Sequence, residues 1–500
     1  MEETTLVRKC LIALVGFSLA ITHFNAVSHP VADQAGSPTL PHAKPEWEKD
    51  GSRVIYDAFP RHSAKEASRD IVVTVSDVTG TLTPATLAVE RVSQDIGARG
   101  YADLQQPFLP NSRHSLLRSQ RADWIHLMPV HMNGELKFRL PPGRYVIHLS
   151  KGLEFKPLKS TIDVQLGSLP LRVDLQLERL FDLRRLGWWS GDPHVHIERM
   201  STADNEEIFW AAQGQDLNVV SLLAMGDRNR IFFPQYAMGA PGSANEGDYW
   251  LHPGQEDPRT ADAGHLIVLN APTLIRDRAR YRDYIAVARA ARAAKAVIGI
   301  AHFKQNESGS MSAAEALLPL GLADFIEILG LPYGFDPNQY FAYLNRGYRI
   351  GVTGGSDFPW GGALGDARTY ALLGPGVPLT PSTWYEAVRK GRTFATDGPL
   401  IDFRIDGAPI GSVLNASVGT EVEVEAKAMT NAFNPNFERL DVYANGELIR
   451  SQPFAPTSVD REATLAFRHR VVTKTWFVFV ARQRDRAVAI SSPIYVDIKQ

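Results

Sequence analysis

The chain of 500 residues holds a single cysteine, Cys10, and this scarcity removes several kinds of chemistry. Disulfide frameworks, thiolate metal sites and cysteine nucleophiles all need sulfur atoms that the rest of the chain does not contain. The chain also has no excess of positive charge, because it contains 53 basic and 55 acidic residues and its formal net charge is −2. Without a polybasic field we expect neither nucleic acid nor an anionic membrane surface as a partner. Any metal ion must therefore be bound by nitrogen and oxygen atoms.

A long apolar run occurs only near the N-terminus. Arg8 and Lys9 precede the apolar stretch 10–21, and Ala26 supplies a small residue suited to a signal peptidase. This order of basic segment, short apolar segment and small residue is typical of a secretory signal. An uncleaved anchor is the alternative, but the run falls short of the roughly 20 apolar residues that span a bilayer. We therefore predict cleavage after 1–26, with a periplasmic or secreted mature chain that is not inserted in the membrane.

The remaining composition is that of an ordinary folded chain. With 44% hydrophobic and 22% charged residues, it excludes a disordered, collagen-like or coiled-coil protein. The length indicates several domains, since one domain has roughly 150 residues. We predict a signal peptide over 1–26, a flexible leader over 27–48, an N-terminal β-sandwich over 49–180, a central domain over 181–400 and a C-terminal β-sandwich over 401–500.

Both flanking blocks carry strand and hairpin patterns. Residues 70–79 are rich in β-branched side chains, and valines and alanines alternate with charged residues over 421–428. A two-residue period of this kind is typical of half-buried strands. The dipeptides Asn-Gly at 133–134 and 445–446 each favour a tight turn between two strands. The sequence therefore predicts a β-sandwich on either side of the central block.

The central block alternates two kinds of segment. Apolar runs suited to buried strands cover 219–225, 297–301, 325–331 and 350–354. Stretches with helical character cover 203–214, 281–295, 312–319, 337–346 and 381–390. Apolar strands that alternate with helices predict a parallel sheet covered by helices, either open or closed into a barrel. Active sites in such folds lie at the carboxyl ends of the strands.

Residues of metal-ligand type stand where those strands end. Asp192, His194 and His196 are two residues apart, so in an extended segment their side chains point the same way. His302 and Asp357 follow two of the apolar runs. Imidazoles and carboxylates without thiolates suit zinc, manganese or iron, and such a set is more typical of a catalytic than of a structural site. The sequence therefore predicts a divalent metal centre.

Each of these residues also has a structural interpretation. Two histidines spaced as His194 and His196 are often surface or core side chains without a ligand. Asp227 stands where the N-cap aspartate of a helix would stand. His265 could begin a strand without binding a metal. The combination favours the metal, because a purely structural domain does not need ligand-type residues at several strand ends.

The segment Gly187–His196, with the sequence GWWSGDPHVH, resembles the opening motif of the PHP (polymerase and histidinol phosphatase) superfamily, specifically of its CehA/McbA-type metallohydrolases. Later segments resemble further motifs of that family in the same order; they are 254–256, 264–266, 300–302, 325–327, 353–357 and 393–399. The resemblance covers the central block. It implies a multidomain chain whose central α/β domain is an irregular (β/α)7 barrel of the PHP type.

The resemblance also implies a site and a reaction. The metal ligands would be His194, His196, Glu256, His302 and Asp357, with His265 as a further candidate. Asp192, Asp227 and Arg228 are the candidate catalytic residues, the carboxylates for proton transfer and the guanidinium for an oxyanion or a substrate carboxylate. We therefore predict an exported hydrolase of small molecules that uses a metal-bound hydroxide on a carbamate, ester or amide bond. A PHP-type phosphoesterase and a non-catalytic envelope-binding protein are the alternatives.

Two departures from the family pattern bear on the number of metal ions. Arg228 and Pro359 stand where the family usually has histidines. Neither residue can bind a cation, since arginine stays protonated and proline has no side-chain donor atom. We therefore expect one or two divalent ions and not three. A surface salt bridge is the alternative role for Arg228. The oligomeric state has no signature in the sequence.

Overall fold

The computed structural model describes residues 54–55, 67–91, 130–303, 308–330, 335–359, 363–432 and 436–499. All of them belong to the second of two compact units, Met1–Lys44 and Pro45–Gln500. The predicted signal peptide and leader lie outside the described residues, so both stay predictions. Within the described part of the chain, no helix is long and apolar enough to cross a membrane.

The N-terminal part is a sheet without helices in its described residues. Its strands are β1 (Val54–Ile55), β2 (Arg69–Asp77), β3 (Pro84–Arg91), β4 (Val130–Asn133), β5 (Glu135–Leu140), β6 (Gly143–Ser150), β7 (Leu158–Val164) and β8 (Leu171–Leu177). Seven strands follow the order β7-β6-β3-β4-β5-β2-β8, and β1 pairs with β5. Tyr145 of β6 and Ile71 of β2, from strands far apart in this order, share one apolar core with Leu177 of β8, the neighbour of β2. Asn133 and Gly134 form the expected turn between β4 and β5.

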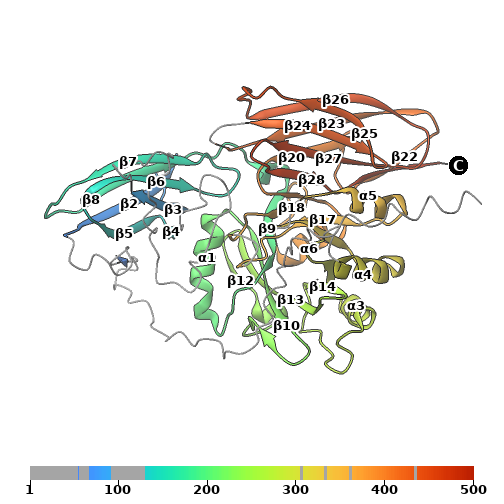
Figure 1. Ribbon diagram of the computed structural model, residues 1–500, viewed down its shortest axis with the longest axis horizontal. Helices are drawn as coiled ribbons and strands as arrows, with labels where there is room; N and C mark the ends of the chain where they lie inside the picture. The colour runs from blue at the N-terminus through green and yellow to red at the C-terminus, as the bar shows by residue number, and fades with distance from the viewer. Residues whose placement is uncertain are drawn as a thin grey trace, which may run out of the picture. The chain divides into compact units, whose positions relative to one another are not determined.

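The central part contains the predicted strands and helices together with strands that were not predicted (Figure 1). Its strands are β9 (Trp188–Val195), β10 (Val219–Gly226), β11 (Ile231–Phe232), β12 (Ala244–Glu246), β13 (Tyr249–Thr260), β14 (Gly264–Leu269), β15 (Val297–Ile300), β16 (Phe325–Leu329), β17 (Gly351–Gly354), β18 (Arg368–Leu372) and β19 (Thr393–Thr396). Its helices are α1 (Asn205–Gly214), α2 (Gly239–Gly242), α3 (Tyr284–Ala293), α4 (Ser308–Leu317), α5 (Asn338–Asn345) and α6 (Pro381–Arg389). Two groups of parallel strands result, β9-β10-β13 and β15-β16-β17.

The predicted (β/α)7 barrel is wrong. β13 and β14 form an antiparallel hairpin, β14 is antiparallel to β15, and β18 is antiparallel to both β9 and β19. Strands make up 48% of the described residues and helices only 15%, a share that includes the helix-free flanking parts. Within the central part, the antiparallel pairs break the even alternation of strands and helices that such a barrel requires. The physical reason lies in the connection 261–263, because a parallel pair needs a crossover of a dozen or more residues.

The C-terminal part, again without helices among its described residues, forms two layers around one core. Its strands are β20 (Leu400–Ile405), β21 (Ala408–Pro409), β22 (Val413–Ala416), β23 (Thr420–Met429), β24 (Phe437–Ala444), β25 (Glu447–Pro453), β26 (Glu462–Val471), β27 (Thr475–Gln483), β28 (Val488–Ser491) and β29 (Ile494–Ile498). The strands β21-β20-β23-β26 form a separate sheet, from which Phe403 packs on Phe479 of the other layer. That other layer continues the central sheet, since β28 pairs with β19. Asn445 and Gly446 form the expected turn between β24 and β25.

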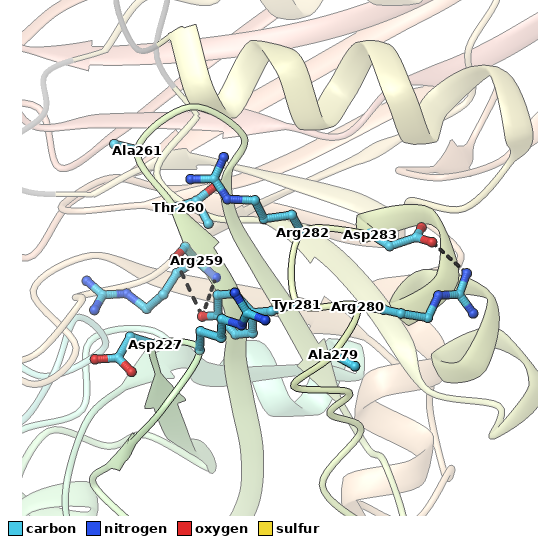
Figure 2. Close-up of a pocket in the computed structure, with 10 residues that line it drawn as sticks. Asp227, Arg259, Thr260, Ala261, Ala279, Arg280, Tyr281, Arg282 and Asp283 are labelled. Atoms are coloured by element: carbon cyan, nitrogen blue, oxygen red, sulfur yellow. Dashed lines mark hydrogen bonds and ion pairs between the residues drawn. The ribbon is translucent and has the colours of Figure 1, made fainter.

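A cleft of about 920 Å³ opens at the edge of the central sheet where β10 and β13 end (Figure 2). Its lining comes from the turn after β10, from the end of β13 and from the segment 279–283 that precedes α3. The residues are Asp227, Arg228, Arg259, Thr260, Ala261, Ala279, Arg280, Tyr281, Arg282 and Asp283.

A buried cluster of charged side chains joins the N-terminal sheet to the central part. Arg179, which follows β8, lies 2.8 Å from Glu154 Oε2 and 3.0 Å from Asp216 Oδ2. Lys151 donates to the backbone oxygen of Gln213 in α1 at 2.9 Å. Burial, and after it the charge of Asp216, raises the pKa of Glu154 to about 7, although Arg179 acts in the opposite direction. This junction therefore contains a carboxyl group that titrates near neutral pH.

Candidate metal centre

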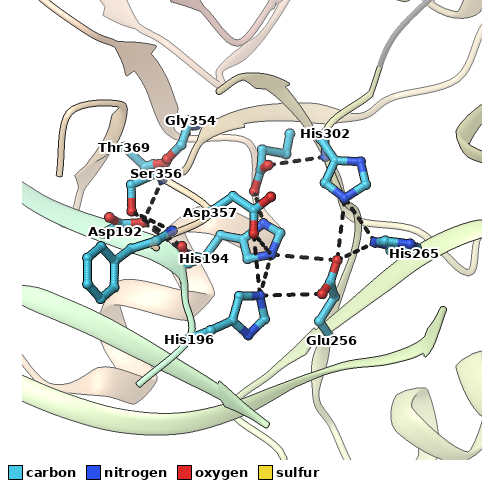
Figure 3. A network of polar contacts seen from close by, with 12 residues as sticks. Asp192, His194, His196, Glu256, His265, His302, Gly354, Ser356, Asp357 and Thr369 are labelled. Carbon is cyan, nitrogen blue, oxygen red and sulfur yellow. Dashed lines mark hydrogen bonds and ion pairs between the residues drawn. The ribbon is translucent and has the colours of Figure 1, made fainter. Parts of the chain in front are cut away.

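Six side chains of ligand type meet at one edge of the central sheet (Figure 3). They are His194 and His196 from the end of β9, Glu256 from β13, His265 from the start of β14, His302 after β15 and Asp357 after β17. β14 runs antiparallel to β13, so its first residues lie at the same edge as the carboxyl ends of the parallel strands. The structure thus brings together all six residues that were predicted as metal ligands, on a sheet that differs from the predicted one.

The first group of ligands consists of His194, His196 and Asp357. The Nε2 atoms of the two histidines are 3.1 Å apart, and Asp357 Oδ1 lies 3.4 Å from the first and 3.5 Å from the second. Four tetrahedral ligands at about 2.0–2.1 Å from a zinc ion are separated from one another by about 3.4 Å. All three side chains are buried. The group therefore has the spacing at which three ligand atoms share one cation.

The second group consists of Glu256, His265 and His302. Glu256 Oε1 lies 2.6 Å from His265 Nδ1 and 3.4 Å from His302 Nε2, and these two nitrogens are 3.0 Å apart. The other oxygen of Glu256 reaches the first group, since Oε2 lies 3.4 Å from His196 Nε2. One carboxylate therefore lies between the two groups and could bind a cation on each side.

Contacts behind the first group orient its two imidazole rings. His194 Nδ1 lies 2.9 Å from Glu327 Oε2, and His196 Nδ1 lies 3.0 Å from the backbone oxygen of Leu223. A carboxylate and a carbonyl oxygen only accept, so Nδ1 carries the proton in each ring and Nε2 faces the site. Histidines that bind metals in proteins almost always donate their other N–H in this way. The chain therefore holds histidine and carboxylate groups that could bind a metal ion.

Sequence reasoning did not assign Glu327, on β16, to the site. Besides its contact with His194, its Oε1 accepts from the backbone N–H of His302 at 3.1 Å. Its side chain is buried. The signal was available, because a charged residue inside the apolar run 325–331 must be paired when the strand is buried. Glu327 therefore links one ligand of each group.

Carboxylates around the histidines determine their protonation. Burial alone lowers the pKa of His194, but Glu327, Asp357 and Glu256 together raise it well above its usual value. Burial alone raises the pKa of Glu256, but His265 and His194 lower it well below its usual range. Several carboxylates are thus buried together at this site, and positive charge is required to stabilise them. A divalent cation bound there would supply that charge in place of protons.

Two of the ligand positions have left-handed backbone. The φ angle is +29° at His302 and +47° at Asp357, and it is +51° at Phe233, whose ring centroid lies 5.6 Å from that of His196. Residues other than glycine rarely adopt such angles. Strain of this kind persists where the surrounding structure holds a functional side chain in place. The backbone geometry therefore agrees with a site that positions these ligands.

Asp192 supports the site from behind and is not one of the grouped ligands. Its Oδ1 accepts from the backbone N–H of His194 and of Ser356, each at 3.1 Å, and its Oδ2 accepts from that of Gly365 at 2.9 Å. Burial raises the pKa of Asp192 to about 6, although its bonds to Ser356 lower it. The carboxylate therefore holds the end of β9 against the segment that carries Asp357.

Asp227 and Arg228 lie in the cleft and not among the ligands. Asp227 Oδ1 accepts from the backbone N–H of Asn229 at 2.7 Å and of Arg230 at 2.8 Å, so it closes a turn and does not cap a helix. Arg228 is exposed, and its Nε donates to the backbone oxygen of Arg278 at 3.3 Å. The described residues show no contact between either side chain and the six ligands.

Comparison with known proteins leaves the family open. No family model and no curated protein matches the sequence. Among solved structures, the sulfur carrier protein SoxY from Chlorobium limicola f thiosulfatophilum is 14% identical with a TM-score of 0.14, over 20% of this chain and 73% of that one. The 3-chlorocatechol 1,2-dioxygenase from Rhodococcus opacus 1CP is 12% identical with a TM-score of 0.17, over 27% and 66%. The fibronectin(III)-like modules of Clostridium thermocellum CbhA are 20% identical with a TM-score of 0.15, over 20% and 100%. Such low TM-scores support no statement about this chain, and the PHP resemblance stays a prediction.

Proposed function

We propose that the protein is a metal-dependent hydrolase of small molecules that acts on carbamate, ester or amide bonds. The observation that carries the proposal is the buried carboxylate of Glu256, whose Oε1 belongs to the second ligand group while its Oε2 reaches His196 of the first. A site that only stabilised the fold would not need an adjoining cleft. Here a cleft begins at Arg259, whose Nε lies 3.8 Å from Glu256 Oε2.

The ligands and the residues behind them have separate tasks in this proposal. His194 and His196 present Nε2 because Glu327 and the backbone oxygen of Leu223 accept from their Nδ1. A divalent cation bound there lowers the pKa of water to about 7 and polarises the bond under attack. Burial of the ligands excludes bulk water, which strengthens each electrostatic interaction inside the site.

Of the two carboxylates predicted for proton transfer, Asp227 is the better placed. Asp192 is buried and already accepts three backbone N–H groups. Asp227 lines the cleft, where two backbone N–H groups fix one of its oxygens. A carboxylate at that position can take a proton from the attacking water and pass it to a leaving group that departs through the cleft. We therefore assign the proton transfer to Asp227, and a positioning role to Asp192.

The test is metal-dependent turnover with a panel of 4-nitrophenyl esters, carbamates and phosphates. We expect the metal-loaded chain to hydrolyse an ester or a carbamate, and we expect a chelator to stop the reaction. Glu256→Gln should reduce turnover at least a hundredfold, whereas Glu423→Gln, on the exposed face of β23, should leave it unchanged. Faster turnover of the phosphates would indicate a phosphoesterase instead. No turnover of any substrate by a metal-loaded chain would contradict a hydrolase and favour a binding protein.

A further inference from the structure

The cleft beside Glu256 is lined by four arginines and two aspartates. Two of these arginines are paired with carboxylates. Arg280 lies 2.6 Å from Asp283 Oδ2, and Arg282 lies 3.2 Å from Asp262 Oδ2. Their charge is thus largely compensated at the rim of the cleft. The other two arginines of the lining are Arg228 and Arg259.

Arg228 is paired with no carboxylate among the described residues. Its Nε donates to a backbone oxygen, that of Arg278, and its side chain is exposed. Asp227, the adjacent carboxylate, turns one oxygen toward the backbone N–H groups of Asn229 and Arg230. The guanidinium of Arg228 therefore keeps most of its donors for a ligand in the cleft, where it can bind a carboxylate through two parallel hydrogen bonds.

Arg259 connects the cleft to the metal centre. Its Nε lies 3.8 Å from Glu256 Oε2, and this buried Nε has no hydrogen-bond partner among the described residues. The backbone N–H of Arg259 donates to the hydroxyl of Tyr281 at 3.1 Å, which holds this end of β13 against the segment before α3 (Figure 2). When Glu256 binds cations, its charge is shared with them, and the guanidinium of Arg259 becomes available to an anion.

We propose that the cleft binds a substrate carrying one carboxylate, which Arg228 and Arg259 hold while the scissile bond lies toward Glu256. This inference rests on the proposed hydrolase function and names the substrate class of that site. A single negative charge fits best, because Arg228 and, once Glu256 binds cations, Arg259 offer two guanidiniums, whereas Asp227 is the one lining aspartate whose carboxylate has no arginine partner among the described residues. Anion recognition by arginine also selects against neutral analogues, since they leave the guanidiniums without a partner.

The reaction for such a substrate is ordinary hydrolysis. Water adds its oxygen to the acyl carbon, the bond between that carbon and the leaving group breaks, and the leaving group takes one proton. An ester or amide gives an acid with one more carboxyl group and an alcohol, phenol or amine. A carbamate gives an alcohol or phenol and a carbamic acid, which releases CO2 and leaves an amine. No oxidant or reductant takes part.

The test uses a matched pair of esters with one acyl chain and one leaving group. Mono-4-nitrophenyl glutarate carries a free carboxylate, and its methyl ester is the neutral partner. We expect the metal-loaded wild-type chain to prefer the anionic ester at least tenfold in kcat/KM. Arg228→Ala should lower that preference about tenfold, and Arg228→Lys should restore part of it. Arg289→Ala, an exposed arginine of α3 outside the cleft, should leave the preference unchanged.

Binding of monomethyl glutarate, which carries one carboxylate, separates this inference from the proposed function when it is measured by calorimetry on the same proteins. If no ester is hydrolysed but monomethyl glutarate binds and Arg228→Ala weakens it at least fivefold, the cleft assignment holds and the hydrolase proposal fails. If both esters are hydrolysed at equal rates, or if monomethyl glutarate binds wild type, Arg228→Ala and Arg289→Ala with equal affinity, the cleft assignment is overturned. Absence of monomethyl glutarate binding to the wild-type chain would overturn it as well.

Discussion

In the candidate metal centre, hydrogen bonds behind the ligands fix the orientation of the ligands themselves. Glu327 contacts the ring of His194 and the backbone of His302, so a single carboxylate orients parts of both ligand groups. Asp192 does the same for the backbone that carries His194 and Asp357. Side chains in such positions act through the ligands and not on a substrate. Removing them therefore weakens metal binding.

Glu327→Gln tests this dependence at a single residue. Glu327 accepts from His194 Nδ1 with one oxygen and from the backbone N–H of His302 with the other, whereas the amide has a single oxygen and can accept from only one of them. One ligand therefore loses its fixed orientation. We expect metal affinity to fall about 10- to 100-fold, the range found when such partners are removed, while the fold is kept. Competition with a chelator measures the affinity. The surface variant Glu423→Gln serves as the control, and equal affinity in all three proteins would show that Glu327 does not position His194.

At the element scale, the sequence predicted the positions of strands and helices better than it predicted which strands pair and in which direction. The apolar runs became β10, β15, β16 and β17, four of the five predicted helical stretches contain α1, α3, α5 and α6, and the stretch 312–319 overlaps only the second half of α4. These features depend on the chain near each residue. The direction in which β13, β14 and β18 pair depends on distant partners, and within residues 249–269 the sequence indicated a possible strand start only at His265. Most ligands were still placed because they stand beside strand ends whichever way the strands pair, whereas Glu256 lies inside β13 and was assigned through the motif resemblance.

Close packing between β15 and β16 gives a test at this scale. A Cβ atom at Gly299 would meet the ring of Phe325 on the adjacent strand. We expect Gly299→Ala to lower the free energy of unfolding by about 1–3 kcal/mol, the usual cost of overpacking a core. Adding Phe325→Leu should recover part of that loss because the smaller side chain makes room. Denaturant unfolding measures both effects, and a Gly299→Ala protein as stable as wild type would contradict the packing of these two strands.

At the scale of the whole molecule, the charged junction between the N-terminal sheet and the central part makes stability depend on pH. The pKa of Glu154 is raised from 4.5 to about 7 on folding, mainly by burial. The folded state therefore holds this proton more tightly than the unfolded state. The resulting stabilisation is fully present below pH 4.5 and is lost as the pH rises through about 7.

Glu154→Gln removes this titration and isolates its contribution. We expect wild type to lose stability relative to the variant between pH 5 and pH 7.5, by a few kcal/mol, since one pKa unit corresponds to about 1.4 kcal/mol. Lys151, whose pKa burial lowers to about 8, titrates mostly above this window. Urea unfolding at several pH values gives the difference directly. A difference that does not vary with pH would show that Glu154 titrates alike in both states.

The central claim is that the protein binds a metal ion through its histidines and carboxylates. The most direct test measures the metal content of wild type and of the double variant His194→Ala/His196→Ala. Wild type should carry about one to two equivalents of zinc, manganese or iron. Neither Arg228 nor Pro359 can bind a third ion. The double variant should lose metal and keep its circular dichroism spectrum, because the cores of the flanking sheets do not involve these histidines. His469→Ala, on β26, should retain the full content. An unchanged metal content in the double variant, or three equivalents in wild type, would contradict the account.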